Sequence, residues 1–92
     1  SHFAPQEGFS ASYLFEITDR NRSLYVNVEN DSLTCKYEKH SSPDVYAKLK
    51  HSVLDEIVHG RMTFQKAFMT GDMAAKGNFK TLRMLDSLFD FS

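Results

Sequence analysis

The sequence predicts a small α+β domain in which an antiparallel sheet of about five strands carries helices packed on one face. Two observations lead to this prediction. Apolar residues recur with a period of two over the first fifty residues, as in strands, and with a helical period beyond residue 51. The connections between the expected strands are short, so we expect the first four strands to form an antiparallel meander.

The strands are indicated by alternation and by turn residues. Residues 9–17 alternate so that one face of the first strand is strongly aromatic. Asn30-Asp31 favours a hairpin between the second and third strands, because both residues tolerate a positive φ. The four strands are expected at residues 9–17, 24–29, 33–38 and 45–50.

Capping residues mark the helices that follow. Ser52, Thr63 and Asn78 are typical N-caps, and Gly60 and Gly71 are typical helix ends. The expected elements are helices at 53–58 and 64–70, a strand at 72–76 and a final helix from residue 79 to Phe91.

The chain carries more apolar surface than its predicted core needs. In a straight final helix, the apolar positions would spread beyond the ~100° stripe that a core requires. The aromatic face of Phe9, Tyr13, Phe15 and Ile17 is expected to lack cover, and Leu14 points to the other face. This surplus predicts an apolar ligand or a protein partner.

Length and composition limit the alternatives. A chain of 92 residues makes one domain, expected at residues 9–92 after a flexible lead-in at residues 1–8. The formal net charge of −1 argues against nucleic acid as a partner. The lone Cys35, the absence of a signal peptide and the lack of a long apolar run predict a cytoplasmic location.

Residues 60–78 resemble the sterol carrier protein type-2 domain, whose signature joins a glycine-basic-apolar turn, a Gln-x-Ala-Phe helix, a strand and a Gly-Asn pair. The matching residues are Gly60, Arg61, Met62, Gln65, Ala67, Phe68, Gly71, Gly77 and Asn78. The order of elements agrees over roughly residues 9–91. Thr63-Phe64 replaces the usual Asn-Pro, and residues 1–8 are too few for the family's N-terminal helix, so we expect a fragment of a longer protein or a cover supplied by a partner.

The resemblance implies non-catalytic binding and transfer of a sterol, fatty acid, acyl thioester or phospholipid in an apolar tunnel between sheet and helices, without a cofactor or metal. The ligand-binding residues expected from it are Phe15, Ile17, Phe64, Gln65, Phe68, Met73, Met84, Leu85, Leu88 and Phe91. The alternative is an interaction module whose apolar face docks onto a neighbouring domain or forms a homodimer.

Other residue groups allow two interpretations each. Met62, Met69, Met73 and Met84 suit either an adaptable lipid cavity or an ordinary core. Gln65 suits either a group that orients a ligand head or an exposed helix position.

The charged residues are better explained by a solvated surface than by a functional site. His51, Asp55, Glu56 and His59 have spacings that allow metal binding or acid–base chemistry, but a solvated helix surface explains them better. A loose basic edge on adjacent strands would make at most weak contact with anionic lipid headgroups, and lysines that block edge pairing are the commoner case. Its residues are Lys36, Lys39, Lys48 and Lys50. No Gly-x-Ser-x-Gly turn supports nucleophilic catalysis.

Overall fold

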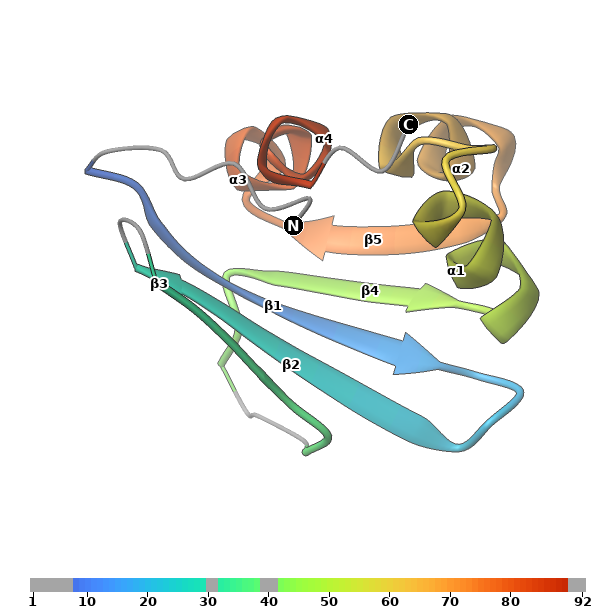
Figure 1. The fold of residues 1–92 in the computed structure, drawn as a ribbon, viewed down its shortest axis with the longest axis horizontal. Coiled ribbons are helices and arrows are strands. Elements are labelled where there is room, and N and C mark those ends of the chain that lie inside the picture. The colour runs from blue at the N-terminus through green and yellow to red at the C-terminus, as the bar shows by residue number, and fades with distance from the viewer. Residues whose placement is uncertain (1–7, 30–31, 39–41, 90–92) are drawn as a thin grey trace.

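A computed structural model of the chain describes residues 8–29, 32–38 and 42–89. These residues form one five-stranded sheet and four helices, with the helices gathered toward the β4–β5 side, away from β3 (Figure 1). The elements are β1 (Ser10–Ile17), β2 (Arg22–Glu29), β3 (Ser32–Lys36), β4 (Val45–Leu49), α1 (His51–Val58), α2 (Phe64–Thr70), β5 (Met73–Gly77), α3 (Phe79–Arg83) and α4 (Leu85–Leu88). The predicted α+β class is confirmed. The expected lead-in lies almost wholly outside the described residues.

The predicted antiparallel meander is wrong at one pair of strands. The sheet order is β3-β2-β1-β4-β5, and β4 pairs with β1 in parallel while the other neighbours run antiparallel. A parallel crossover normally needs a long connection, because the chain must return along the whole strand. Here β3 ends level with Leu14 and β4 begins level with Tyr13, so no return is needed. The connection 37–44 crosses only three strand spacings, about 14 Å, against a reach of about 27 Å.

The aromatic face of β1 is covered. Tyr13, Phe15 and Ile17 are buried, and Phe9 is partly buried, which corrects the expectation that this face lacks cover. The Phe15 ring lies 5.8 Å from the Phe64 ring of α2, measured between centroids. The Tyr13 hydroxyl donates a hydrogen bond of 2.8 Å to a backbone carbonyl of α3. The helices therefore meet this face of the sheet directly, and their apolar residues form one core with it.

The final helix is two short helices rather than one. α3 ends at Arg83 and α4 begins at Leu85, with Met84 between them. Leu82 of α3 and Leu85 and Leu88 of α4 all enter the core. Of the other apolar residues assigned to that helix, Met84 and Phe89 are partly buried and Phe79 is exposed, so the apolar surplus is smaller than the sequence predicts.

Helix α1 also begins differently from the prediction. Its N-cap is Lys50, not Ser52, because β4 runs straight into the helix, and the Lys50 side chain has no acceptor for a capping bond. The first helical N–H, that of His51, instead donates to the Asp19 carboxylate at 2.8 Å. A residue from the β1–β2 turn thus satisfies the helix start.

The outer face of the sheet separates the lysines that the sequence placed together. Lys36 lies on β3 and Lys48 on β4, with β2 and β1 between them. The prediction that these two strands are adjacent is therefore wrong. Leu14 is buried on this face between Tyr25 and Tyr46 in the register. Lys39 lies outside the described residues.

Candidate functional site

A pocket of about 420 Å³ lies among α2, α3 and α4. Among the described residues, its wall contains five apolar and three polar ones, all from these helices: Phe64, Gln65, Phe68, Met69, Phe79, Leu82, Arg83 and Asp86. Phe68, Met69 and Phe79 are exposed, Phe79 to 60 %, whereas Phe64 and Leu82 are buried. The rings of Phe68 and Phe79 approach each other across the pocket, 6.4 Å apart between centroids. The pocket therefore has an apolar floor that continues into the core and an apolar rim that meets solvent.

Helix α2 is held in place at both ends. The Thr63 hydroxyl accepts a hydrogen bond of 3.0 Å from the Lys66 N–H, and Gly71 ends the helix at a φ of +84°. Asp86 of α4 adds a second cap, because its two carboxylate oxygens accept from the N–H groups of Phe64 and Gln65 at 2.8 and 2.9 Å. The Asp86 carboxylate thus joins α4 to the start of α2, and both helices contribute to the wall of the pocket.

Helix α3 is fixed by its cap and by the sheet. The Asn78 side chain accepts from the N–H groups of Lys80 and Thr81 at 3.0 and 3.1 Å. The Asn78 N–H donates to the Asp44 carbonyl at 3.1 Å, and the Tyr13 hydroxyl donates to the Thr81 carbonyl. Burial, and to a lesser extent the charge of Asp44, raises the pKa of Tyr13 well above its usual range, so this phenol stays a neutral donor.

The three polar residues of the pocket differ in what they have left to offer a ligand. Both Asp86 oxygens already accept backbone hydrogen bonds. The Gln65 amide donates weakly to the Met69 sulfur at 3.9 Å, within its own helix. The Arg83 side chain is exposed and makes no hydrogen bond or ion pair with the other described residues. Arg83 and Gln65 can therefore meet the polar end of a ligand whose apolar part fills the pocket.

The structure brings together three of the residues predicted to bind a ligand. Phe64, Gln65 and Phe68 line the pocket. The others lie elsewhere: Phe15, Met73, Leu85 and Leu88 are in the core, Met84 packs against it, Ile17 is buried beside a different hollow, and Phe91 lies outside the described residues. Of the four methionines, Met69 lines the pocket, Met73 is core, and Met62 and Met84 pack on the core.

The sequence did not predict four of the pocket residues: Phe79, Leu82, Arg83 and Asp86. For Met69, it left open whether the side chain lines a lipid cavity or fills an ordinary core. Phe79 and Leu82 were visible as apolar positions of the final helix, at the helical spacing of three. Asp86 lies 22 residues from Phe64 in the sequence, and no local pattern indicates that the Asp86 carboxylate binds the Phe64 N–H.

The acidic and histidine residues of α1 interact with one another and with Arg61 at the surface. His59 lies 3.3 Å from Asp55 and Arg61 forms an ion pair with Glu56. Within the described ranges, no group of three or more His, Cys, Asp or Glu side chains has a metal-binding arrangement. None of the helices among those residues is long and apolar enough to span a membrane.

Comparison with known families addresses the resemblance seen at residues 60–78. The model of the SCP-2 sterol transfer family matches residues 4–90, nearly the whole chain. The chain belongs to the SCP-2 sterol transfer family. Membership of this family supports lipid binding and transfer in general. No curated protein matches the sequence significantly.

Solved structures share the SCP-2 fold at low sequence identity. A stereoselective inverting sec-alkylsulfatase from Pseudomonas sp. matches at 22 % identity with a TM-score of 0.79, over 91 % of this chain but 13 % of its own. This SCP-2 chain thus spans only a small part of that enzyme's length. Sterol carrier protein 2 like 2 from Aedes aegypti matches at 15 % identity with a TM-score of 0.71, over 94 % of this chain and 79 % of its own.

A third structure supports the same fold. Sterol carrier protein 2 from Yarrowia lipolytica matches at 21 % identity with a TM-score of 0.66, over 84 % of this chain and 62 % of its own.

Proposed function

We propose that this domain binds the apolar part of a lipid in the pocket among α2, α3 and α4, without catalysing a reaction. The observation that supports this most directly is the pocket itself, which combines exposed aromatic residues at its rim with an apolar floor. Its volume of about 420 Å³ falls within the roughly 300–1,000 Å³ common for small-molecule sites. Sterols, fatty acids, acyl thioesters and phospholipids are the ligand classes we consider.

The driving force is the burial of methylene groups. Each buried methylene contributes about 0.8 kcal/mol, so an acyl chain gains affinity with every carbon that enters the pocket. Ordering of the chain and loss of its freedom offset part of this gain. Gln65 and Arg83 would stay at the polar end of the ligand, where their side chains keep contact with water.

The proposal is tested by titrating saturated fatty acids of increasing length against the protein. Affinity should rise by about fourfold per methylene, the equivalent of about 0.8 kcal/mol, and then level off when the chain outgrows the pocket. Phe68→Ala should move this limit to longer chains, because it removes a ring from the pocket wall.

Leu33→Ala is the matched control. Leu33 and Phe68 have the same exposed fraction, 37 %, but Leu33 lies on β3, outside the pocket. A length limit that both variants leave unchanged would contradict binding in this pocket.

The alternative function is an interaction module. The exposed side chains of Phe68, Met69 and Phe79 would dock onto a neighbouring domain or a second copy of the chain. The small share of the sec-alkylsulfatase that matches supports the view that such a fold can be one part of a larger protein.

Lipid extraction and mass spectrometry of the purified protein distinguish the two functions. A stoichiometric co-purifying lipid supports lipid binding, whereas an empty protein that sediments as a dimer supports the interaction module. The homodimer and the cytoplasmic location stay predictions.

A further inference from the structure

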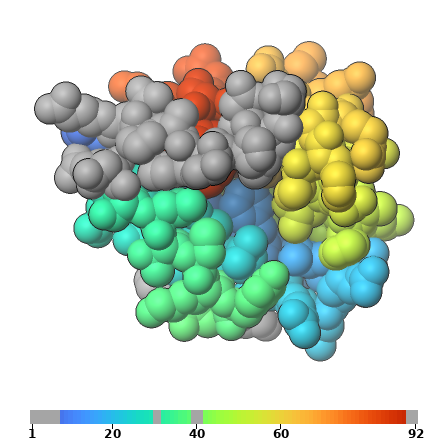
Figure 2. Space-filling model, viewed as in Figure 1, coloured from blue at the N-terminus to red at the C-terminus, as the bar shows by residue number. Residues whose placement is uncertain are grey.

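A second hollow lies at the opposite part of the molecule, where the β1–β2 turn, the end of β3 and the start of α1 meet. Two adjoining pockets of about 390 and 470 Å³ share Ile17, Arg22 and Tyr37. Arg20 and His51 complete the wall of the larger one. Figure 2 shows the green end of β3, the light-blue turn and the yellow-green α1 around a hollow on this face. In the part of the chain that the structure describes, this hollow shares no residue with the pocket among α2, α3 and α4.

Hydrogen bonds bring the basic residues of this hollow together. The Thr18 N–H donates to the Leu49 carbonyl at 3.0 Å, and the His51 N–H donates to Asp19 at 2.8 Å. These two bonds fasten the β1–β2 turn to the junction of β4 and α1. They place Arg20 and Arg22, on and just after the turn, beside His51 at the helix start.

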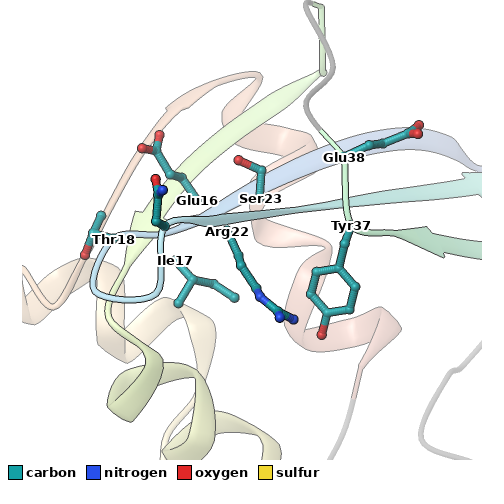
Figure 3. A pocket seen from close by; sticks show the side chains of 8 residues that line it. Glu16, Ile17, Thr18, Arg22, Ser23, Tyr37 and Glu38 are labelled. Carbon is teal, nitrogen blue, oxygen red and sulfur yellow. The ribbon is translucent and has the colours of Figure 1, made fainter.

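Arg22 is held toward the hollow rather than left free. It pairs with Ile17 in the register, and its guanidinium carbon lies 5.4 Å from the centroid of the Tyr37 ring. Figure 3 shows Ile17, Arg22 and Tyr37 on one side of the strands. A guanidinium over an aromatic face is weakly hydrated there and keeps its edge free for hydrogen bonds.

Among the described residues, three carboxylates lie at or near this hollow: Glu16 and Glu38 line the smaller pocket, and Asp19 lies beside His51. Glu16 and Glu38 point to the other side of the strands in Figure 3, and Glu16 accepts a hydrogen bond from the Tyr46 hydroxyl. Asp19 accepts the His51 N–H, and this bond is the main cause that lowers the pKa of its carboxyl, with smaller contributions from the charges of Arg20 and His51. The wall formed by Ile17, Arg20, Arg22, Tyr37 and His51 therefore carries two permanent positive charges and no carboxylate.

We propose that this hollow binds an oxyanion, a phosphate or sulfate group carried by a ligand or a lipid headgroup. Guanidinium groups match the tetrahedral oxyanion with two parallel hydrogen bonds each, and the imidazole and the phenol add further donors. The volume exceeds what a free ion needs, so there is room for the organic group to which the oxyanion is attached.

Two titrations of the intact chain test this proposal. In the first, inorganic phosphate is added to ¹⁵N-labelled protein, and we expect saturable shifts of the backbone amides of Arg20, Arg22, Tyr37 and His51. In the second, the protein is sedimented with phosphatidylcholine vesicles that contain phosphatidylglycerol. Arg20→Gln/Arg22→Gln should weaken binding by about tenfold or more in whichever titration shows binding, because it removes both guanidinium groups.

Lys66→Gln/Lys80→Gln is the matched control, since it removes the same charge from α2 and α3. Saturable phosphate binding that only the arginine variant loses supports a site for a free phosphate group. Vesicle binding that only the arginine variant loses supports a headgroup site. Equal losses in both variants, or no binding in either titration, would overturn the proposal.

Two further measurements keep the result interpretable. If the double variant does not fold, Arg20→Gln alone on the exposed turn should weaken binding by about threefold. A folded arginine variant should bind a fluorescent fatty acid as the unmodified chain does, because the hollow and the apolar pocket are separate. Failure of the unmodified chain to bind the fatty acid while it binds phosphate would instead count against the lipid pocket alone.

Discussion

Asp86 joins two helices with one carboxylate. Both of its oxygens accept backbone hydrogen bonds from the first turn of α2, so its removal leaves two N–H groups without their acceptor. Asp86→Ala should lower the free energy of unfolding by about 2 kcal/mol, as measured by urea denaturation.

Ser87→Ala, at the exposed next residue, provides the control and should change stability by less than about 0.5 kcal/mol. Asp86→Asn should fall between the two, because the amide keeps only one acceptor oxygen. Equal stability of the Asp86→Ala and Ser87→Ala variants would show that the double cap contributes nothing.

Asp19 should make stability depend on acid pH. Its pKa is lowered mainly by the hydrogen bond from the His51 N–H, so the folded state favours the carboxylate. A lowered folded-state pKa stabilises the protein above the unfolded value of about 3.9, and this contribution is lost as the pH falls through the folded value. The melting temperature of the unmodified chain should therefore exceed that of Asp19→Asn at pH 6, and the gap should narrow as the pH falls below the unfolded value and through the lower folded value.

Glu29→Gln controls for the loss of one negative charge. Its melting temperature should not show the same closing gap. A difference between Asp19→Asn and the unmodified chain that is constant with pH would contradict the role of the carboxylate.

At the scale of elements, two glycines with positive φ differ in how much a substitution by alanine should destabilise the fold. Gly77, at the end of β5, has a φ of +124°, and a Cβ there would collide with the Asp44 carbonyl at the start of β4. Gly71 has a φ of +84°, but a Cβ there would meet open space. Gly77→Ala should cost more than about 2 kcal/mol and Gly71→Ala about 1 kcal/mol in urea denaturation. Similar costs for both would mean that β4 and β5 can separate without penalty.

At the scale of the whole molecule, the core and the pocket should respond separately to substitution. Leu88 is fully buried in the core, although the sequence placed it in a ligand tunnel, while Phe79 is mostly exposed at the pocket rim. Leu88→Ala should lower the free energy of unfolding by about 2–5 kcal/mol. Phe79→Ala should cost less than about 1 kcal/mol and still weaken the binding of a fluorescent fatty acid.

The two variants control for each other. They are compared by urea denaturation and by fatty-acid titration at a temperature where both are folded. A Leu88→Ala protein that stays as stable as the unmodified chain, but loses lipid affinity, would return Leu88 to the ligand site.

The sequence by itself determined the local elements and the family. Alternation marked the strands, and the caps at Thr63 and Asn78 formed as expected, because these signals act between residues at most a few positions apart. Phe64, Gln65 and Phe68 reached the pocket for the same reason, since one short helix carries all three.

The tertiary structure alone decided how those elements meet. The offset between β3 and β4 permitted a parallel pairing that connection length seemed to forbid. Asp86 caps α2 from 22 residues away, and the hydrogen bond from His51 to Asp19 joins residues 32 apart. Such contacts depend on the packing of whole elements against one sheet face, and no local pattern of residues encodes them.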